Sequence, residues 1–516
     1  MKQIGVIPLT TVGAVVTAAV LTLVACAVVA ALLPRLRGTS AEGPAPTTAL
    51  RRPARHRARH RARRLLGAVA AVLVPALLAL ATGGLALNRS GDYVPTVADL
   101  VSTATSSKPV TGDVEPLAPT ARLDAVPASR WRARFTRLKD GTWTTTFRGP
   151  VSGIDLDVRV ILPTGYSPTN GRTYDVIEGL HGYPGDPGSF SSALDARAAL
   201  DKAIGSGLIP PSIMVMPSLA PDGRQHDCAN IAGRPAVGTW AAQEIPRMVG
   251  ATFPNTTRDR SGWLLMGLSS GAYCAAWLAM NDDAQYGAAG VMSGYDRPVE
   301  GSMAHGGSAV ASANTLSAMV HERTGRPGVR YYVLGSQDDP YAAALTAWRM
   351  QAAQNADDAV TTDTPATGGH TWRLWSSRLP TMLRWWGSDP AVFRAAGLTT
   401  TQSAQAAAST SITPVVDTPL SQRTSRAVAE ARRGTPTDPG GAITLAACVL
   451  LCLLGSAALL RWGPGGAGAG AWALRSLAVL LVGTAIAATI GLIGNALTGF
   501  ATSWDDLGGI VISALQ

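Results

Sequence analysis

Short apolar runs, separated by segments of helical length, occupy the middle of the chain. Between residues 154 and 162, apolar residues alternate with mostly polar ones, as in a strand that buries one face. Later runs are continuously apolar, as in strands buried on both faces: YDVIEGL, SIMVMP, WLLMG, AAGVMSG and RYYVLG. Asp140 and Gly141, set between strand-like residues, indicate a hairpin. The pattern predicts an α/β domain over residues 131–390, with a mostly parallel sheet and helices on both faces.

Much longer apolar runs lie near the two ends of the chain, at residues 4–33, 65–87, 442–460 and 477–497. A helix needs about 20 apolar residues to cross a bilayer. With 47% apolar and 15% charged residues, the whole chain is also apolar for a soluble protein. We therefore expect two transmembrane helices within residues 1–87 and two more within residues 441–497, followed by a short tail at 498–516.

The net charge of +10 is unevenly distributed. Ten arginines lie between residues 35 and 64, opposed there only by Glu42. The positive-inside rule places this loop, 34–64, in the cytoplasm, so the α/β domain is expected outside it. Segments rich in Pro, Ser, Thr and Ala, at 88–130 and 391–440, are the expected linkers. The chain is thus expected in the cell membrane as a multi-pass protein.

A nucleic-acid-binding arm is the rival interpretation of the basic segment. The segment contains no aromatic residue that could stack on bases, and it lies between two expected spans. We therefore expect the membrane bilayer as a partner and no nucleic acid. The sequence leaves protein partners open.

One short motif carries the strongest chemical signal. Gly267-Leu268-Ser269-Ser270-Gly271 fits the G-x-S-x-G pattern, follows the apolar run WLLM and precedes what looks like an amphipathic helix. Strand, sharp turn and helix are the context of a nucleophile elbow, in which small flanking residues let strand and helix approach. Ser269 is the expected nucleophile.

A serine hydroxyl needs a base, and the order serine, acid, histidine is expected in such a fold. His370 lies in a glycine-rich loop after the last expected strand, whereas His305 precedes any plausible acid and His321 lies in a helical segment. The run RYYVLGSQDDP supplies adjacent carboxylates. Asp338, three residues after Gly335, is the preferred acid, and Asp339 is the alternative.

Two backbone N–H groups are needed to bind a developing oxyanion. The N–H of Ser270 follows the nucleophile directly, and the loop after the first parallel strand offers the N–H of Tyr183. His181 in the same loop is interpreted as a packed residue, with contact to substrate or a role as base as the alternatives.

Two cysteines, Cys228 and Cys274, lie in the expected outer domain. In an oxidising compartment they form either a disulfide or two buried thiols. The histidines are scattered and show no spacing typical of metal ligands. We expect no metal and no organic cofactor.

Taken in order, ILPTGY, LHGYPG, GLSSGAY, GVMSG and GGHTWRLW resemble the esterase-D-like branch of the α/β-hydrolases, which includes secreted esterases and mycolyltransferases. The resemblance covers about residues 131–386 and implies the α/β-hydrolase fold and a serine triad. His370-Thr371-Trp372, with Trp375, is especially similar to mycolyltransferases. Those enzymes usually present a glutamate as the acid, whereas this chain offers aspartates. Trp372 and Trp375 are expected either to line the substrate site or to pack in the core.

These observations favour a membrane-anchored, extracytoplasmic serine esterase or acyltransferase. Its expected substrate is an ester of the cell envelope, carried by a lipid, a glycan or an aminoacyl group. The alternative is a catalytically inactive hydrolase fold that serves as an envelope scaffold or receptor. No triad residue type is missing from the sequence, which favours the enzyme.

Overall fold

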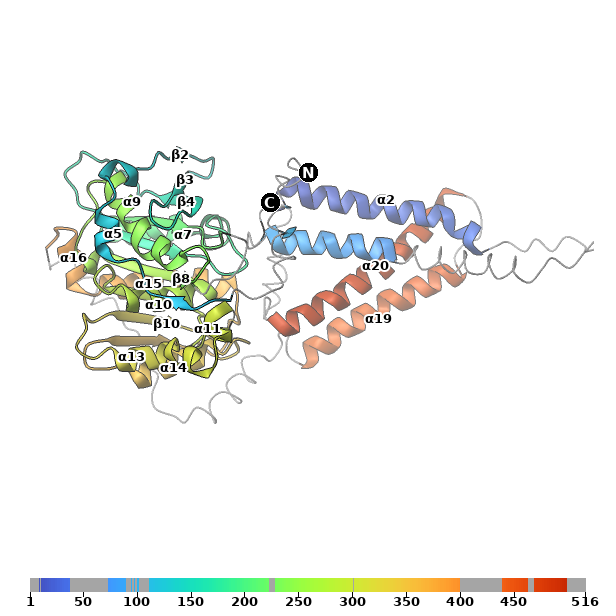
Figure 1. Cartoon of the computed structure of the whole chain (residues 1–516). Coiled ribbons are helices and arrows are strands. Elements are labelled where there is room, and N and C mark those ends of the chain that lie inside the picture. The colour runs from blue at the N-terminus through green and yellow to red at the C-terminus, as the bar shows by residue number, and fades with distance from the viewer. Residues whose placement is uncertain are drawn as a thin grey trace, which may run out of the picture. The chain divides into compact units, whose positions relative to one another are not determined.

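The computed structural model describes residues 11–37, 73–89, 111–221, 228–299, 301–399, 439–462 and 468–498, with a few isolated positions. The described residues fall into two compact units. One contains the sheet and its helices, and the other contains long helices from the two ends of the chain (Figure 1). The Arg-rich segment 38–64 and the segment 400–438, which makes up most of the expected second linker, lie outside the described residues.

A sheet of nine strands forms the centre of the first unit, in the order β11-β10-β9-β8-β5-β6-β4-β3-β2. Pairing is parallel from β11 to β6 and antiparallel from β6 to β2. The strands are β2 (Thr136–Arg137), β3 (Trp143–Arg148), β4 (Asp155–Ile161), β5 (Asp175–Leu180), β6 (Ser212–Pro217), β8 (Trp263–Leu268), β9 (Ala288–Met292), β10 (Arg330–Leu334) and β11 (Ala359–Asp363). A separate antiparallel pair joins β1 (Val114–Glu115) to β7 (Asn230–Ile231).

The predicted strands are present. The five continuously apolar runs form β5, β6, β8, β9 and β10. Every residue of these strands is buried except Arg330, the first residue of β10. The hairpin predicted at Asp140 and Gly141 joins β2 to β3. The architecture is therefore an α/β-hydrolase-like fold with a mostly parallel sheet.

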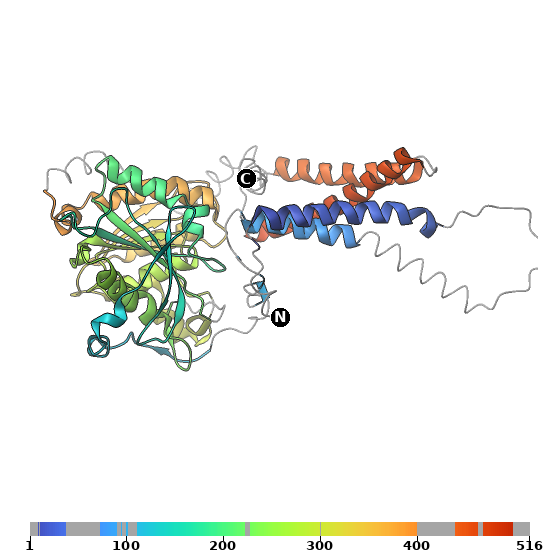
Figure 2. The ribbon, with the colours of Figure 1, turned by 90° about the horizontal axis from the view of Figure 1, so that it is seen from above.

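Helices cover both faces of the sheet (Figure 2). Successive residues of a buried strand point to opposite faces, so Leu264 and Leu265 belong to different apolar clusters. One cluster includes residues of α9 (Ile245–Thr252), α10 (Ser270–Asn281), α13 (Leu316–Glu322) and α14 (Ala343–Ala353). The other includes residues of α7 (Ala196–Gly205), α15 (Trp372–Gly387) and α16 (Pro390–Ala395).

The remaining short helices of this unit are α5 (Thr120–Asp124), η1 (Ala128–Trp131), α6 (Ser189–Ser192), α8 (Val237–Thr239), η2 (Trp240–Glu244), η3 (Arg260–Gly262), α11 (Gly301–His305) and α12 (Ser308–Ala313). The helix after Ser269 differs from expectation. Residues 270 to 280 of α10 are all buried, so the helix is covered all round and is not amphipathic. Its outer side is closed by later segments. Tyr273 and Trp277, for example, hydrogen-bond to Asn314.

The second unit is made of α2 (Val12–Arg37), the helix Leu73–Arg89, α19 (Pro439–Trp462) and α20 (Ala469–Thr498). By length and composition, two described segments suffice to cross a membrane, Val12–Ala31 and Ala469–Gly491. The apolar parts of the other two helices, Leu73–Arg89 and Ile443–Ala458, are shorter. Residues 65–72, which the predicted second span included, lie outside the described residues.

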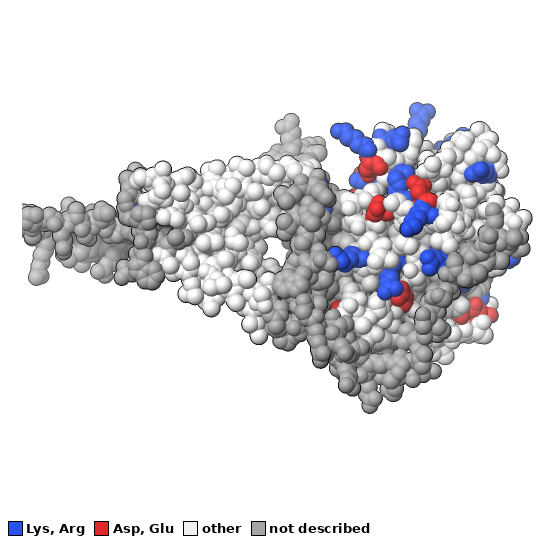
Figure 3. Space-filling view, turned by 180° about the vertical axis from the view of Figure 1, so that it is seen from behind, with Lys and Arg blue, Asp and Glu red and all other residues white. Residues whose placement is uncertain are grey.

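The first unit buries large apolar side chains, whereas this unit buries mostly small ones and exposes large ones. The helix α20 contacts both α2 and α19, and Thr22 of α2 hydrogen-bonds to Thr82 of the helix Leu73–Arg89. Buried side chains are mostly small: Ala18, Thr22, Cys26, Ala30, Ala76, Ser456, Ala471, Ala478 and Ala485. Large apolar side chains face outward, with Ile443 69% and Leu451 67% exposed. The described surface of these helices seen in Figure 3 is almost free of charged side chains.

Candidate active site

Ser269 lies on the turn between β8 and α10. Its backbone has φ 56° and ψ −120°, a conformation that residues other than glycine rarely adopt. The two flanking glycines are required by close packing. A side chain at Gly267 would clash with the backbone of Gly271, and one at Gly271 would clash with the carbonyl of Leu180. The sequence motif therefore folds into the strained turn that the nucleophile elbow needs, with Ser269 half-buried.

His370 connects this serine to a carboxylate. Its Nε2 lies 2.8 Å from Ser269 Oγ, and its Nδ1 lies 2.9 Å from Asp339 Oδ2. With the proton on Nδ1 donated to the carboxylate, Nε2 accepts from the serine hydroxyl. The Asp339 side chain is fully buried and that of His370 is 5% exposed. This is the geometry of a hydroxyl, a base and an orienting acid.

The prediction that Asp338 contacts the histidine is wrong. Asp338 Oδ1 accepts instead from the backbone N–H of Gly369, at 2.8 Å. The spacing argument fails because the loop after β10 turns back: the N–H of Asp339 bonds to the carbonyl of Ser336. This turn directs Asp339 to the imidazole ring. Asp338 holds the backbone of the loop that carries His370, and Ser336 assists it by donating to the carbonyl of Gly369.

Two aromatic rings meet the edges of the imidazole. The ring centroid of Trp375 lies 5.1 Å and that of Tyr341 4.7 Å from the centroid of His370. Trp375 is buried and donates from Nε1 to Ser293 Oγ, so it is a core residue that supports the histidine. Trp372 is half-buried against Trp375. The sequence offered no signal for Ser293 beyond its position at the end of an apolar run.

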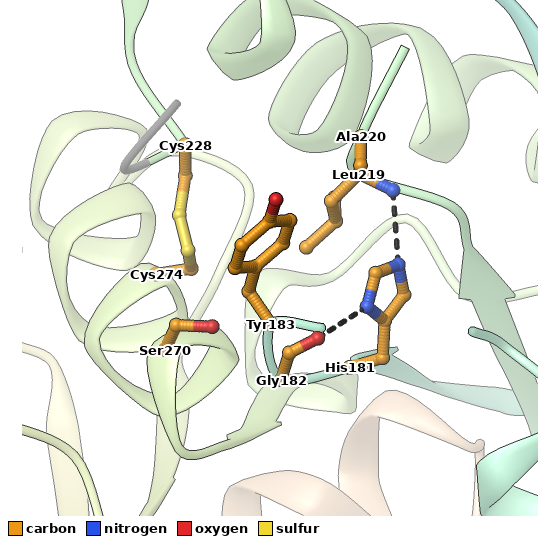
Figure 4. A pocket seen from close by; sticks show the side chains of 8 residues that line it. All are labelled: His181, Gly182, Tyr183, Leu219, Ala220, Cys228, Ser270 and Cys274. Carbon is orange, nitrogen blue, oxygen red and sulfur yellow. Dashed lines mark hydrogen bonds between the residues drawn. A yellow bond between two sulfur atoms is a disulfide. The ribbon is translucent and has the colours of Figure 1, made fainter. Parts of the chain in front are cut away.

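The predicted oxyanion residues meet beside the serine. Gly182 packs so closely on Ser269 that an added Cβ would lie 3.2 Å from the serine Cβ. Tyr183 and Ser270 line one small pocket, together with Leu219 and the Cys228–Cys274 pair (Figure 4). Ser270 is also the first residue of α10, and N–H groups in the first turn of a helix lack intrahelical acceptors. The two backbone segments chosen from the sequence therefore lie at one pocket.

His181 is occupied by the backbone on both sides of its ring. Nδ1 lies 2.7 Å from the carbonyl of Gly182, and the N–H of Leu219 donates to Nε2 at 3.1 Å. Burial lowers the pKa of His181 to about 4, and the bond to Gly182 only partly offsets this effect. The ring is therefore neutral and has no nitrogen left for a substrate. This geometry fits the packed-residue interpretation and opposes the proposed contact with substrate.

The bond from His181 also orients a peptide group. The carbonyl of Gly182 and the N–H of Tyr183 belong to the same peptide unit, and in a trans unit they point in opposite directions. Because His181 holds the carbonyl, the Tyr183 N–H points away from the imidazole ring. Figure 4 shows the ring of His181 on one side of Gly182 and the Tyr183 side chain between Leu219 and the cysteine pair.

A disulfide joins Cys228 to Cys274, with the Cα atoms 5.5 Å apart. Of the two arrangements left open by the sequence, this is the one found in the structure. The bond ties the segment after β6 to the second turn of α10, next to the pocket of Figure 4. Among the described residues, no cluster of three or more His, Cys, Asp or Glu side chains is arranged to hold a metal ion.

One family model matches part of this chain. Residues 151–386 match the family model described as "Putative esterase". No curated protein sequence matches the chain.

The solved structures to which this chain is similar include the following three, all with low sequence identity. FphF, a fluorophosphonate-binding serine hydrolase of Staphylococcus aureus, is 14% identical, covers 48% of this chain and 97% of its own, and gives a TM-score of 0.41. A ferulic acid esterase is 18% identical, with 48% and 97% covered and a TM-score of 0.39. MPT51 (FbpC1) of Mycobacterium tuberculosis is 17% identical, with 51% and 99% covered and a TM-score of 0.34.

Proposed function

We propose that this chain is a membrane-anchored serine esterase or acyltransferase acting on an ester of the cell envelope. The match of residues 151–386 to the family model described as "Putative esterase" supports this proposal. One observation carries the proposal. An unbroken chain of hydrogen bonds runs from Ser269 Oγ through the His370 ring to Asp339, at 2.8 and 2.9 Å. These are the contacts that convert a weakly nucleophilic hydroxyl into an attacking group.

The first half of the reaction forms an acyl-enzyme. His370 Nε2 takes the proton of Ser269 as Oγ attacks the ester carbonyl carbon. The N–H groups of Tyr183 and Ser270 bind the oxyanion, and Asp339 stabilises the imidazolium. As the tetrahedral intermediate collapses, the carbon–oxygen bond to the alcohol breaks, and His370 returns the proton to the leaving oxygen.

The second half repeats these steps with a new nucleophile. His370 takes a proton from water or from an acceptor alcohol, whose oxygen attacks the acyl carbon. The bond from that carbon to Ser269 Oγ then breaks, and His370 returns the proton to Ser269 Oγ. Water gives hydrolysis and an alcohol gives acyl transfer. Lipid, glycan and aminoacyl esters all suit this chemistry, so the envelope substrate is proposed from the expected location of the domain.

Membrane anchoring is supported by the packing of the helical unit. Four helices that bury small residues and expose leucine, valine and isoleucine are suited to lipid, which solvates large apolar side chains. The disulfide in the hydrolase domain favours an oxidising compartment outside the cytoplasm. We therefore propose four spans, with the Arg-rich loop inside the cell and the hydrolase domain outside.

Catalysis is tested with the full chain in detergent. Wild type should react with a fluorophosphonate probe and hydrolyse nitrophenyl acetate, whereas Ser269→Ala should lose labelling and about 10⁵-fold in kcat. His321→Ala, on the exposed end of α13, is the matched control and should keep full activity. A folded wild type without labelling or turnover would refute the enzyme and leave the inactive scaffold.

Topology is tested with alkaline phosphatase, which is active only outside the cytoplasm. Fusions after residue 50 should be inactive, and fusions after residue 110 should be active. The reverse pattern would place the hydrolase domain inside the cell.

A further inference from the structure

Tyr341 is an exposed aromatic residue in direct contact with the proposed base. The residue is 46% exposed, and its ring meets the His370 ring at 4.7 Å between centroids and 65° between planes. The other aromatic neighbour of the imidazole, Trp375, is buried. Of these two rings on His370, Tyr341 is therefore the one that a substrate can reach.

The loop that carries Tyr341 is firmly held. Asp339 accepts from the Tyr341 N–H through Oδ1 at 2.8 Å, while its Oδ2 bonds to His370. The N–H of Ala342 bonds to the carbonyl of Asp339, and Gly335 packs against the backbone of Ala343 at the start of α14. One carboxylate thus sets the positions of both the imidazole and the tyrosine. The ring is placed by the same turn that orients the base.

The proposed reaction indicates which part of an ester would lie beside Tyr341. His370 Nε2 must reach the oxygen of the leaving alcohol in order to protonate it, so the alcohol part of an ester lies next to the imidazole. The acyl carbonyl oxygen lies instead at the pocket of Tyr183 and Ser270. A side chain that touches His370 and faces solvent therefore meets the alcohol and not the acyl chain.

Resting on the proposed function, we propose that Tyr341 binds the alcohol part of the ester and, in transfer, the acceptor alcohol. An aromatic ring in this position favours alcohols built on a ring with an apolar face. Phenols and sugars share this chemistry. Tyr341 would thus set preference for the alcohol, while leaving preference for the acyl group unchanged.

The test compares two substrate series on wild type, Tyr341→Ala and Tyr341→Phe. The first series keeps the acetyl group and varies the alcohol: ethyl acetate, phenyl acetate and an acetylated glucoside. The second keeps nitrophenol and lengthens the acyl chain. Gln351→Ala, exposed on helix α14 just after the loop that carries Tyr341, is the control, and thermal melting verifies folding.

In Tyr341→Ala, kcat/KM should fall about tenfold for the ring alcohols and less than about twofold for ethyl acetate. The ranking of acyl chains should not change, and Tyr341→Phe should resemble wild type. A fall for only phenyl acetate or only the glucoside identifies which ring alcohol the site prefers.

Equal losses for all alcohols, no loss at all, or a changed acyl ranking would each overturn this inference. These outcomes require an active wild type, so they are distinct from failure of the proposed function, in which wild type itself neither labels nor turns over.

Discussion

Two buried histidines lie in loops that meet near Ser269, and their partners differ. His370 is 4% exposed and His181 is 3% exposed, so burial does not distinguish them. His370 bonds to the side chains of Ser269 and Asp339, whereas His181 bonds to a backbone carbonyl and a backbone N–H. The partners of His370 suit a group that accepts and returns a proton, whereas those of His181 hold the backbone of its loop.

The comparison shows that the hydrogen-bond partners of a histidine, and not its burial, decide whether the ring can act as a base. A carboxylate beside Nδ1 stabilises the charged ring that forms when Nε2 accepts a proton. A backbone N–H beside Nε2 requires a lone pair there and therefore a neutral ring. His181 therefore supports the backbone of the loop that carries Tyr183, whereas the contacts of His370 suit a ring that gains and loses a proton.

The largest expected effect separates the two histidines directly. His370→Ala should lower kcat by about 10⁵-fold or more because the base is gone. His181→Gln, which retains a donor and an acceptor for the backbone, should lower kcat by at most about 10²-fold through a less well-aimed oxyanion donor. Turnover of nitrophenyl acetate measures both. A folded His181→Gln variant as inactive as His370→Ala would remove the distinction.

The adjacent residues Asp338 and Asp339 allow a second comparison, because both bond to the loop that carries His370. Asp339→Asn should lower kcat by about 10⁴-fold because an amide disfavours the required tautomer of His370. In Asp338→Asn the amide oxygen still accepts from the N–H of Gly369, so the loss should stay below about tenfold. Single-turnover acylation rates decide between them, and the opposite ranking would restore Asp338 as the acid.

The Cys228–Cys274 disulfide lies beside the pocket of Tyr183 and Ser270. The Cys228–Cys274 bond spans 46 residues, for which chain entropy gives about 4 kcal/mol of stabilisation. The double variant Cys228→Ser with Cys274→Ser should therefore unfold at lower temperature, while the Ser269–His370 contact stays intact. Calorimetry in detergent with and without reductant measures the change. An unchanged midpoint for the transition of the hydrolase domain would show that the bond adds no stability.

The smallest expected effect concerns pH. The pKa of His181 is lowered by burial to about 4, from an ordinary value of about 6.5, so the unfolded chain binds more protons between these values. Its contribution to stability is complete above about pH 6.5 and is lost as pH falls towards 4, by about 3 kcal/mol in all. His181→Gln should flatten this part of the stability curve. Equal slopes of unfolding free energy against pH in wild type and His181→Gln would contradict a lowered pKa for His181.

Much of the fold could be predicted because its signals are local. Alternating and continuous apolar runs report the period and burial of strands, and glycines around a serine report a sharp turn. Ser269, His370, Tyr183 and Ser270 were found in this way, and the structure brings Ser269 to His370 and Tyr183 to Ser270. Each depends on the end of one strand and the few residues that follow it.

Other features depend on contacts between distant segments. Asp339 and His370 are 31 residues apart, and whether Asp338 or Asp339 faces the ring depends on a turn that bonds residue 339 to residue 336. Burial of α10 on all sides likewise depends on segments after β9. In the second unit, the described helices show large apolar residues outside and small ones within, an arrangement that hydropathy alone does not reveal.

By itself, the sequence determined where the main strands lie along the chain, the elbow at Ser269, the histidine loop and the apolar character of both ends, because these follow from spacing and turn chemistry. Only the tertiary structure decided that Asp339 holds His370, that both nitrogens of His181 bond to the backbone, and that Tyr341 meets the base at the surface. The physical reason is that hydrogen bonds between loops depend on the direction in which each turn sends a side chain. That direction is set by packing against residues far away in the chain.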